Sequence, residues 1–135
     1  MRTTKPILLL EDDLVDQEAV SMALEELKVI NKIEACSNGE EGLEYLKHQL
    51  PVIILLDLNM PKMDGFDFLK VVKNDKNFKR IPVIVFTTSS EERDKVDSYN
   101  LGVAGYIVKP SSHEKFVEVL HALDVYWTIS ELPQS

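Results

Sequence analysis

The segment Val52-Ile53-Ile54-Leu55-Leu56-Asp57 decides the fold class of this chain. Its five apolar residues follow one another without interruption, whereas a strand with one face in water would alternate apolar and polar residues. Continuous apolar runs are typical of parallel strands that helices cover on both faces. Similar runs occur at residues 7–10 and 83–86, so we predict an α/β protein built around a buried parallel sheet.

Two further strands complete the predicted sheet. Residues 32–36 alternate polar and apolar side chains, which favours an edge position, and residues 106–108 form a short fifth run. Longer segments with apolar residues three or four positions apart separate the strands and are expected to be helices. Five strand–helix units in series, joined by right-handed crossovers, predict one doubly wound sheet.

The helical segments carry apolar stripes that should face the sheet. The expected inward residues are Val20, Ala23, Leu24 and Leu27 in the first helix, Phe66, Leu69 and Val72 in the third, and Phe116, Leu120 and Leu123 in the fifth. The third helix should begin near Gly65. Capping boxes are expected at residues 37–40, 89–92 and 111–114. Residues 126–135 should extend beyond the fifth helix.

Composition restricts the class of protein. A chain of 135 residues with 44% hydrophobic and 28% charged residues is expected to form one domain. Its net charge of −8 argues against direct nucleic-acid binding, which depends on neutralising phosphates. The single cysteine, Cys36, is expected to be a buried apolar residue on a strand. Neither a membrane span nor a signal peptide is evident, so we expect a cytoplasmic protein.

Polar residues stand where four of the predicted strands end. They are the run Glu11-Asp12-Asp13, then Asp57, Thr87 and Lys109. The carboxyl ends of parallel strands form one edge of the sheet, where open α/β sheets place their ligand sites. An acidic cluster, a hydroxyl and an ammonium at one edge suit a divalent cation together with a phosphoryl group.

The acidic cluster predicts a Mg²⁺ site. Mg²⁺ prefers oxygen ligands and takes few carboxylates from a protein, and Glu11, Asp12 and Asp57 could supply them. Two carboxylates 4 Å apart repel by roughly 4 kcal/mol at an effective dielectric constant near 20, so a cation is the expected compensation. The alternative is a solvated acidic rim that only caps helices, and we expect that role for Asp13. Lys109 is expected to reach Asp57.

Taken in order, these residues resemble the receiver domains of two-component response regulators, particularly the stand-alone chemotaxis type. The resemblance covers about residues 5–123. It rests on Glu11-Asp12, on residues 57–65 (Asp-Leu-Asn-Met-Pro-Lys-Met-Asp-Gly), on Thr87, and on residues 102–110 (Gly-Val-Ala-Gly-Tyr-Ile-Val-Lys-Pro). It implies a flavodoxin-like fold with strand order 2-1-3-4-5.

The resemblance also implies roles for individual residues. Asp57 would accept a phosphoryl group from a phosphohistidine of a sensor histidine kinase. Asp12, Asp57 and the backbone carbonyl of Asn59 would bind Mg²⁺, with Glu11 acting through water. Thr87 and Lys109 would hold the phosphoryl oxygens, and Lys109–Pro110 would be a cis peptide. Thr87 and Tyr106 would form the conformational switch. The chain would not be an enzyme but a phosphoacceptor that assists its own phosphorylation and dephosphorylation.

The end of the chain departs from the transcription-factor receivers. Residues 1–125 would form the receiver domain and 126–135 an extension, with no effector domain, so the output would be a protein partner or self-association. The segment 124–133 resembles small response regulators that work with phytochrome-type kinases. Its apolar residues Tyr126, Trp127, Ile129 and Leu132 predict a homodimer through the fourth helix, the fifth strand, the fifth helix and this tail.

Two other functions are possible on the residues alone. One is an aspartyl-phosphate phosphatase of the haloacid dehalogenase class, although Glu11-Asp12-Asp13 lacks the Asp-x-Asp spacing of that class. The other is a pseudo-receiver that is not phosphorylated and acts as a binding module. A P-loop nucleotide enzyme is excluded because the sequence contains no Gly-x₄-Gly-Lys.

Overall fold

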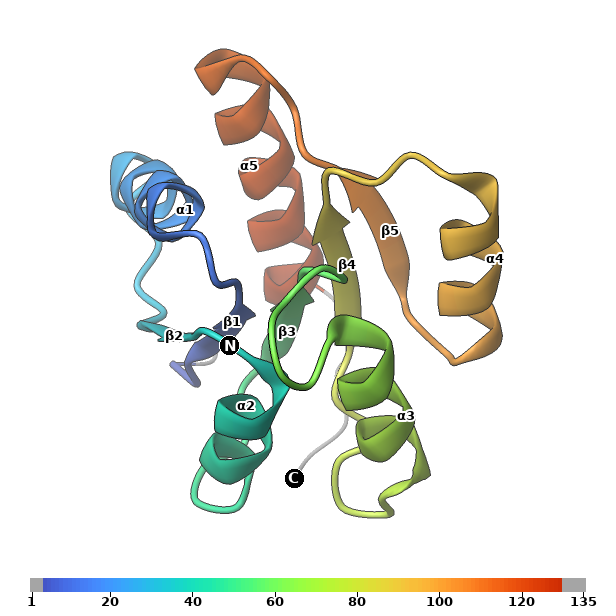
Figure 1. Cartoon of the computed structure of the whole chain (residues 1–135). Helices are drawn as coiled ribbons and strands as arrows, with labels where there is room; N and C mark the ends of the chain where they lie inside the picture. Colours follow the sequence, from blue (N-terminus) through green and yellow to red (C-terminus); the bar gives the residue numbers. More distant parts are fainter. Residues whose placement is uncertain (1–3, 130–135) are drawn as a thin grey trace.

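The computed structural model describes residues 4–129 and places five parallel strands in one sheet (Figure 1). The strands are β1 (Ile7–Leu10), β2 (Ile33–Cys36), β3 (Ile53–Leu56), β4 (Val83–Thr87) and β5 (Gly105–Val108). Their order is β2-β1-β3-β4-β5, and every neighbouring pair is parallel. The predicted fold class and strand order are confirmed, and the predicted strand boundaries differ from these by at most one residue.

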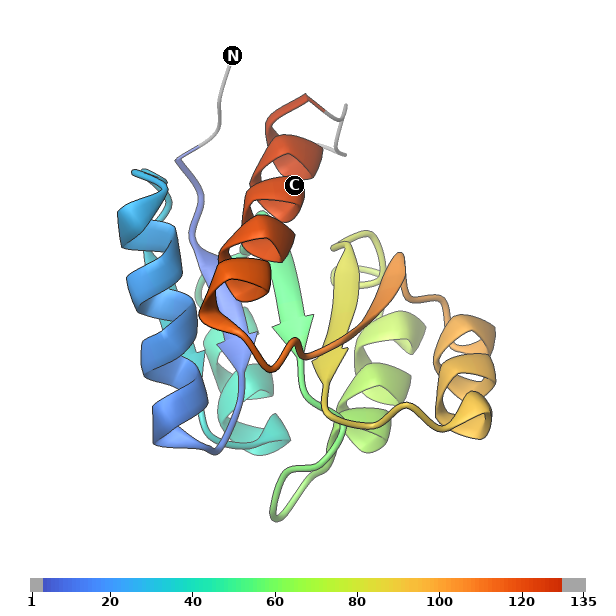
Figure 2. The same cartoon turned by 90° about the horizontal axis from the view of Figure 1, so that it is seen from above.

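Five helices connect and cover the strands. They are α1 (Leu14–Glu26), α2 (Gly39–Leu46), α3 (Gly65–Asn74), α4 (Glu92–Asn100) and α5 (His113–Ile129). Helices α1 and α5 lie on one face of the sheet, and α2 and α3 lie on the other, with α4 beside β5 (Figures 1 and 2). Among residues 4–129 no helix is both long and apolar enough to cross a membrane.

The sheet separates two apolar cores, which explains the continuous apolar runs. Along β1, Leu8 and Leu10 enter the core shared with α2 and α3, whereas Ile7 and Leu9 enter the core shared with α1 and α5. Successive side chains of a strand point to opposite faces, so a strand buried on both faces needs an apolar residue at every position. Cys36 is buried at the end of β2, as predicted, and burial raises the pKa of its thiol to about 11.

The predicted helix stripes are largely confirmed, with one correction in α3. Leu69 and Val72 are buried there, but Phe68 is the aromatic residue that is completely buried, and Phe66 is only half-buried. Positions 68, 69 and 72 share one side of a helix because side chains four positions apart lie one above the other. Leu27, at the end of α1, is also only half-buried.

Helix α5 is one turn longer than predicted. It continues to Ile129, and Trp127 extends the buried stripe of Phe116, Leu120 and Leu123. The Trp127 side chain is 2% exposed and packs in the chain's own core. The prediction that residues beyond 125 leave the helix is therefore wrong for 126–129, and so is the use of Trp127 as a dimer anchor. Leu132 lies outside the described residues.

The helix starts differ from the predicted capping boxes. Asn38, not Ser37, caps α2 and accepts the N–H of Glu41 at 3.0 Å. Before α4, the hydroxyl of Ser89 donates to Asp94 at 2.6 Å in place of a cap. At α5 the Ser112 hydroxyl accepts the N–H of Lys115 at 3.3 Å. Runs of neighbouring Ser and Asn residues offer several possible caps, and packing of the helix selects one.

Candidate phosphoacceptor and metal site

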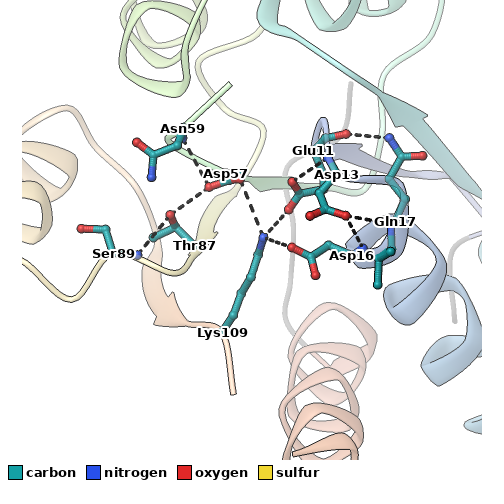
Figure 3. Close-up of polar contacts among 10 residues, drawn as sticks. Glu11, Asp13, Asp16, Gln17, Asp57, Asn59, Thr87, Ser89 and Lys109 are labelled. Atoms are coloured by element: carbon teal, nitrogen blue, oxygen red, sulfur yellow. Dashed lines mark hydrogen bonds and ion pairs between the residues drawn. The ribbon is translucent and has the colours of Figure 1, made fainter. Parts of the chain in front are cut away.

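The site is built by backbone hydrogen bonds that continue past the ends of the strands. The N–H of Glu11 donates to the carbonyl of Cys36 at 2.9 Å, and the N–H of Asp57 donates to that of Leu10 at 3.0 Å. On the other side, the N–H of Lys109 donates to the carbonyl of Thr87 at 2.8 Å. Four residues predicted to meet at the edge of the sheet, Glu11, Asp57, Thr87 and Lys109, therefore do meet there (Figure 3).

Asp57 is a carboxylate with two unequal oxygens. Its side chain is mostly buried, at 7% exposed for the residue. Oδ1 accepts the hydroxyl of Thr87 at 2.8 Å and the N–H of Asn59 at 3.3 Å. Oδ2 faces the Lys109 ammonium at 3.7 Å, which is an ion pair but is too long for a hydrogen bond. Thr87 is completely buried, so its hydroxyl has a fixed direction toward Asp57.

Lys109 projects into the middle of the acidic cluster. Its side chain is 8% exposed, and its Nζ donates to Oε1 of Glu11 and, at 2.8 Å, to Oδ2 of Asp16. Burial by itself would lower the pKa of Lys109, but the hydrogen bonds to Asp16 and Glu11 and the charge of Asp57 outweigh it and raise the pKa. The ammonium therefore stays charged and offsets the repulsion among the carboxylates around it.

Burial perturbs the carboxylate of Glu11. Burial, and to a smaller degree the charge of Asp57, raises its pKa to about 7, although the Lys109 ammonium opposes the shift. The residue is held from two sides: its Oε2 accepts the N–H of Asp13 at 3.2 Å, and its backbone carbonyl accepts Nε2 of Gln17 at 2.6 Å. Glu11 thus has a defined position before any ligand binds.

The predicted metal ligands lie close enough to share one cation. One carboxylate oxygen each from Glu11, Asp12 and Asp57 lies within 4.8 Å of the others. Asp12 is exposed, which leaves a side open to solvent. An all-oxygen donor set with an open side fits a hard divalent cation that keeps part of its water shell. Asp13 has the predicted capping role, because its side chain accepts the N–H of Val15 at 2.8 Å.

The start of α3 packs against the backbone of Asp57 and Leu58. The N–H of Gly65 donates to the carbonyl of Leu58 at 3.1 Å. A Cβ at position 65 would lie 2.6 Å from the backbone oxygen of Asp57 and 2.6 Å from the Cα of Leu58. Only glycine allows the helix to approach the residues that follow β3 so closely.

Tyr106 connects β5 to the loop after β4. The residue is half-buried, and its hydroxyl donates to the backbone carbonyl of Ser89 at 2.9 Å. Ser89 is two residues beyond Thr87, so the two predicted switch residues are joined through one short loop. The predicted cis peptide at Lys109–Pro110 is wrong, since no peptide bond among residues 4–129 is cis. The trans form is the intrinsically favoured one even before proline.

Asp16 is the main site residue that the sequence did not reveal. It lies in the first turn of α1, where acidic residues commonly complement the helix dipole and need no further explanation. Its ion pair with Lys109 joins residues 93 positions apart in sequence. In the sequence, the only sign that Asp16 belongs to the site is its position three residues after Asp13, which places it close to the acidic cluster.

Comparisons with known proteins agree with this geometry. The sequence model of the response regulator receiver domain matches residues 7–121. The chain is 34% identical over 127 residues to the probable methanogenesis regulatory protein FilR2 of Methanothrix harundinacea, covering 90% of this chain and 82% of that protein. It is 33% identical over 130 residues to the response regulator Rcp1 of Synechocystis sp., covering 91% and 88% of the two chains.

Solved structures give the same result. The phosphorylated cyanobacterial phytochrome response regulator RcpA superposes with a TM-score of 0.90 at 34% identity, over 98% of this chain and 100% of that one. The Mn²⁺-bound form of Rcp1 superposes with a TM-score of 0.86 at 33% identity, over 96% and 99%. With its sheet order, its clustered carboxylates and these matches, the chain belongs to the response regulator receiver domain family.

Proposed function

We propose that Asp57 accepts a phosphoryl group from a phosphohistidine of a sensor histidine kinase. The observation that carries the proposal is the pairing of Asp57 with a hydroxyl donor, Thr87, at 2.8 Å and with the ammonium of Lys109 at 3.7 Å. The family match favours a receiver over a phosphatase of the dehalogenase class. Phosphorylation itself is what separates an active receiver from a pseudo-receiver.

In this proposal one carboxylate oxygen of Asp57 attacks phosphorus. The new O–P bond forms as the P–N bond of the phosphohistidine breaks, and the electron pair of that bond remains on the imidazole. Phosphoryl transfer needs alignment of the reacting atoms and neutralisation of charge on the equatorial oxygens. Lys109 supplies a compact positive charge and Thr87 a hydroxyl donor, and both lie within reach of a group attached to Asp57.

The metal that we propose is Mg²⁺. Asp12, Asp57 and the backbone carbonyl of Asn59 would hold it, with Glu11 acting through water. When bound, it would supply positive charge to the phosphoryl oxygens. The clustered carboxylates support this assignment, and so does the fact that Rcp1 was crystallised in a Mn²⁺-bound form.

We propose that the phosphoryl group is sensed through Thr87 and Tyr106 and that the output surface is the face of α4, β5 and α5. Val96 and Tyr99 on α4 and Val108 on β5 are exposed apolar residues on that face, suited to a protein partner or a second copy. The similarity to RcpA, a phytochrome response regulator, favours a phytochrome-type kinase as the donor. In this role the chain is a cytoplasmic phosphoacceptor and has no separate substrate to turn over.

The test is intact-mass spectrometry after incubation with acetyl phosphate and Mg²⁺. We expect one added phosphoryl group on the wild type and none on Asp57→Asn. Asp13→Asn is the matched control, because it removes a neighbouring carboxylate but keeps a side chain that caps helices equally well. Full labelling of Asp57→Asn, or loss of labelling in Asp13→Asn alone, would overturn the assignment.

A further inference from the structure

Lys109 contacts three carboxylates, and they are not equivalent. Two of them, Glu11 and Asp57, belong to the cluster that can share a divalent cation. The third, Asp16, comes from α1 and is not part of that cluster. A bound cation would therefore compete with Lys109 for Glu11 and Asp57 but would leave Asp16 as a partner for the ammonium.

The distances show where Lys109 is held. Its Nζ is 2.8 Å from Oδ2 of Asp16 and 3.7 Å from Oδ2 of Asp57. The shorter contact is a charge-assisted hydrogen bond, whereas the longer one is not a hydrogen bond. With 8% of its side chain exposed, Lys109 has little contact with water that could replace a lost partner. Asp16 and Glu11 therefore draw the ammonium away from the phosphoacceptor.

We infer that Asp16 is a positioning residue that holds Lys109 in the resting state and competes with the phosphoryl group for its ammonium. This inference rests on the proposed phosphorylation of Asp57. Formation of the phosphoryl-bound state moves Lys109 toward Asp57, and the contact with Asp16 weakens as it does so. Asp16 thereby sets the balance between the resting and the phosphorylated state without touching the phosphoryl group.

Removal of the Asp16 charge has two consequences of opposite sign. In Asp16→Asn the ammonium binds Glu11 and Asp57 more tightly, and the site has one negative charge fewer, so Mg²⁺ binds more weakly. The same freed ammonium is available to a phosphoryl oxygen, so a phosphoryl mimic binds more strongly once Mg²⁺ is saturating. A variant that merely damaged the fold would weaken both.

The experiment measures two dissociation constants by titration calorimetry on the full chain. The first is for Mg²⁺ alone, and the second is for beryllofluoride at saturating Mg²⁺. For Asp16→Asn we expect beryllofluoride to bind roughly tenfold more tightly, the low end for a hydrogen bond between charged groups, and Mg²⁺ to bind severalfold more weakly. Glu18→Gln, an exposed site on the same helix, is the control for loss of one charge and should change neither constant by more than about twofold.

A second readout follows Lys109 directly. In ¹⁹F NMR of the beryllofluoride complex, the fluorine that faces the Lys109 ammonium should shift in Asp16→Asn and keep its position in Glu18→Gln. Beryllofluoride affinity that is unchanged or reduced in Asp16→Asn would overturn the inference. If wild type and Asp57→Asn bound beryllofluoride equally, the proposed phosphoacceptor itself would be wrong, which is a separate result.

Discussion

Two lysines of this molecule are withdrawn from water, and their surroundings shift their pKa values in opposite directions. Lys109, at the carboxyl end of the sheet, lies among carboxylates that raise its pKa in spite of burial. Lys73, at the end of α3, donates to the backbone carbonyls of Lys79 and Ile81 at 3.0 Å each, and burial lowers its pKa. The ammonium of Lys109 thus pairs with carboxylates, whereas that of Lys73 hydrogen-bonds to backbone carbonyls.

The comparison shows that burial alone does not identify a functional lysine. Burial disfavours the charged form of any lysine, and nearby negative charge and hydrogen bonds to the ammonium can reverse that effect. At Lys73 the ammonium satisfies carbonyls of the segment between α3 and β4, which is a structural task. At Lys109 the ammonium offsets the negative charge of a carboxylate cluster where, in the proposed function, a cation and a phosphoryl group bind. The following predictions test that distinction.

The largest effect should come from Lys109→Met, which keeps the length of the side chain but removes the charge. Beryllofluoride at saturating Mg²⁺ should bind about 100-fold more weakly, near the upper end for loss of a hydrogen bond between charged groups. Without metal, the variant should also lose about 3 kcal/mol of unfolding free energy at pH 8, because buried carboxylates lose their cation. Calorimetric titration and chemical denaturation measure the two quantities, and wild-type affinity in this variant would refute the role.

The second effect is a pH dependence of stability caused by Glu11, whose pKa is raised by burial and lowered by Lys109. The pKa of Glu11 is about 7 in the folded protein, against an ordinary value of 4.5. Folding therefore binds a proton between these values, so the contribution of Glu11 to stability is complete below pH 4.5 and is lost as pH rises through 7. In the metal-free protein we expect a loss of about 3 kcal/mol over that range.

Other carboxylates change stability over the same pH range, so the measurement is a difference. Unfolding free energies of wild type and Glu11→Gln, determined by urea denaturation from pH 4 to 8, should diverge as the pH rises, with the wild type falling relative to the variant. Parallel curves would mean that Lys109 fully compensates the burial of Glu11.

Lys73→Met should lower stability without changing ligand affinity, whereas Lys109→Met lowers both. Two backbone carbonyls lose their donor, which should cost about 1–3 kcal/mol of unfolding free energy. Beryllofluoride affinity should stay within about twofold of the wild type, because Lys73 donates to Ile81, just before the start of β4, and so lies at the end of the sheet opposite to the site. A large loss of affinity in this variant would show that the two lysines are coupled.

The smallest effect is the stabilisation by Mg²⁺ and its loss in Asp12→Ala. At ten times its dissociation constant, Mg²⁺ should add about 1.4 kcal/mol to the unfolding free energy of the wild type. Asp12→Ala should lose this gain but keep or exceed the metal-free stability, since it removes one of several repelling carboxylates. Thermal melts with and without Mg²⁺ decide the matter, and a full Mg²⁺ shift in Asp12→Ala would count against Asp12 as a ligand.

The parts of the fold that could be predicted are those with a strong local signal. The buried strands follow from uninterrupted apolar runs, and their parallel arrangement then places Glu11, Asp57, Thr87 and Lys109 at one edge. The prediction that Phe66, and not Phe68, faces the core was wrong. Both residues fit a helical stripe, and only packing against the sheet determines which one is buried. The predicted end of α5 was wrong because no glycine or proline occurs between the start of the helix and Pro133 to mark where it stops.

The parts of the site that could not be predicted depend on pairs far apart in sequence. Asp16 is an ordinary residue of a helix start until Lys109 reaches it from β5, and the Ser89–Asp94 hydrogen bond replaces a capping box that the sequence also allowed. Such contacts depend on the exact distance between a strand end and a helix. Apolar periodicity fixes which side of an element faces the sheet, but not that distance.

The position of Trp127 gives the protein an internal fluorescent probe. It is the single tryptophan of the chain, it lies in the core between the sheet and helices α1 and α5, and its indole N–H has no hydrogen-bond acceptor among residues 4–129. Such an indole should emit at short wavelength in the folded protein and shift to the red when unfolding admits water. Trp127 lies near the carboxyl end of α5, whereas the amino end of α5 follows Lys109 at the charged edge of the sheet. Its emission should therefore report on folding while remaining largely insensitive to ligands bound at Asp57.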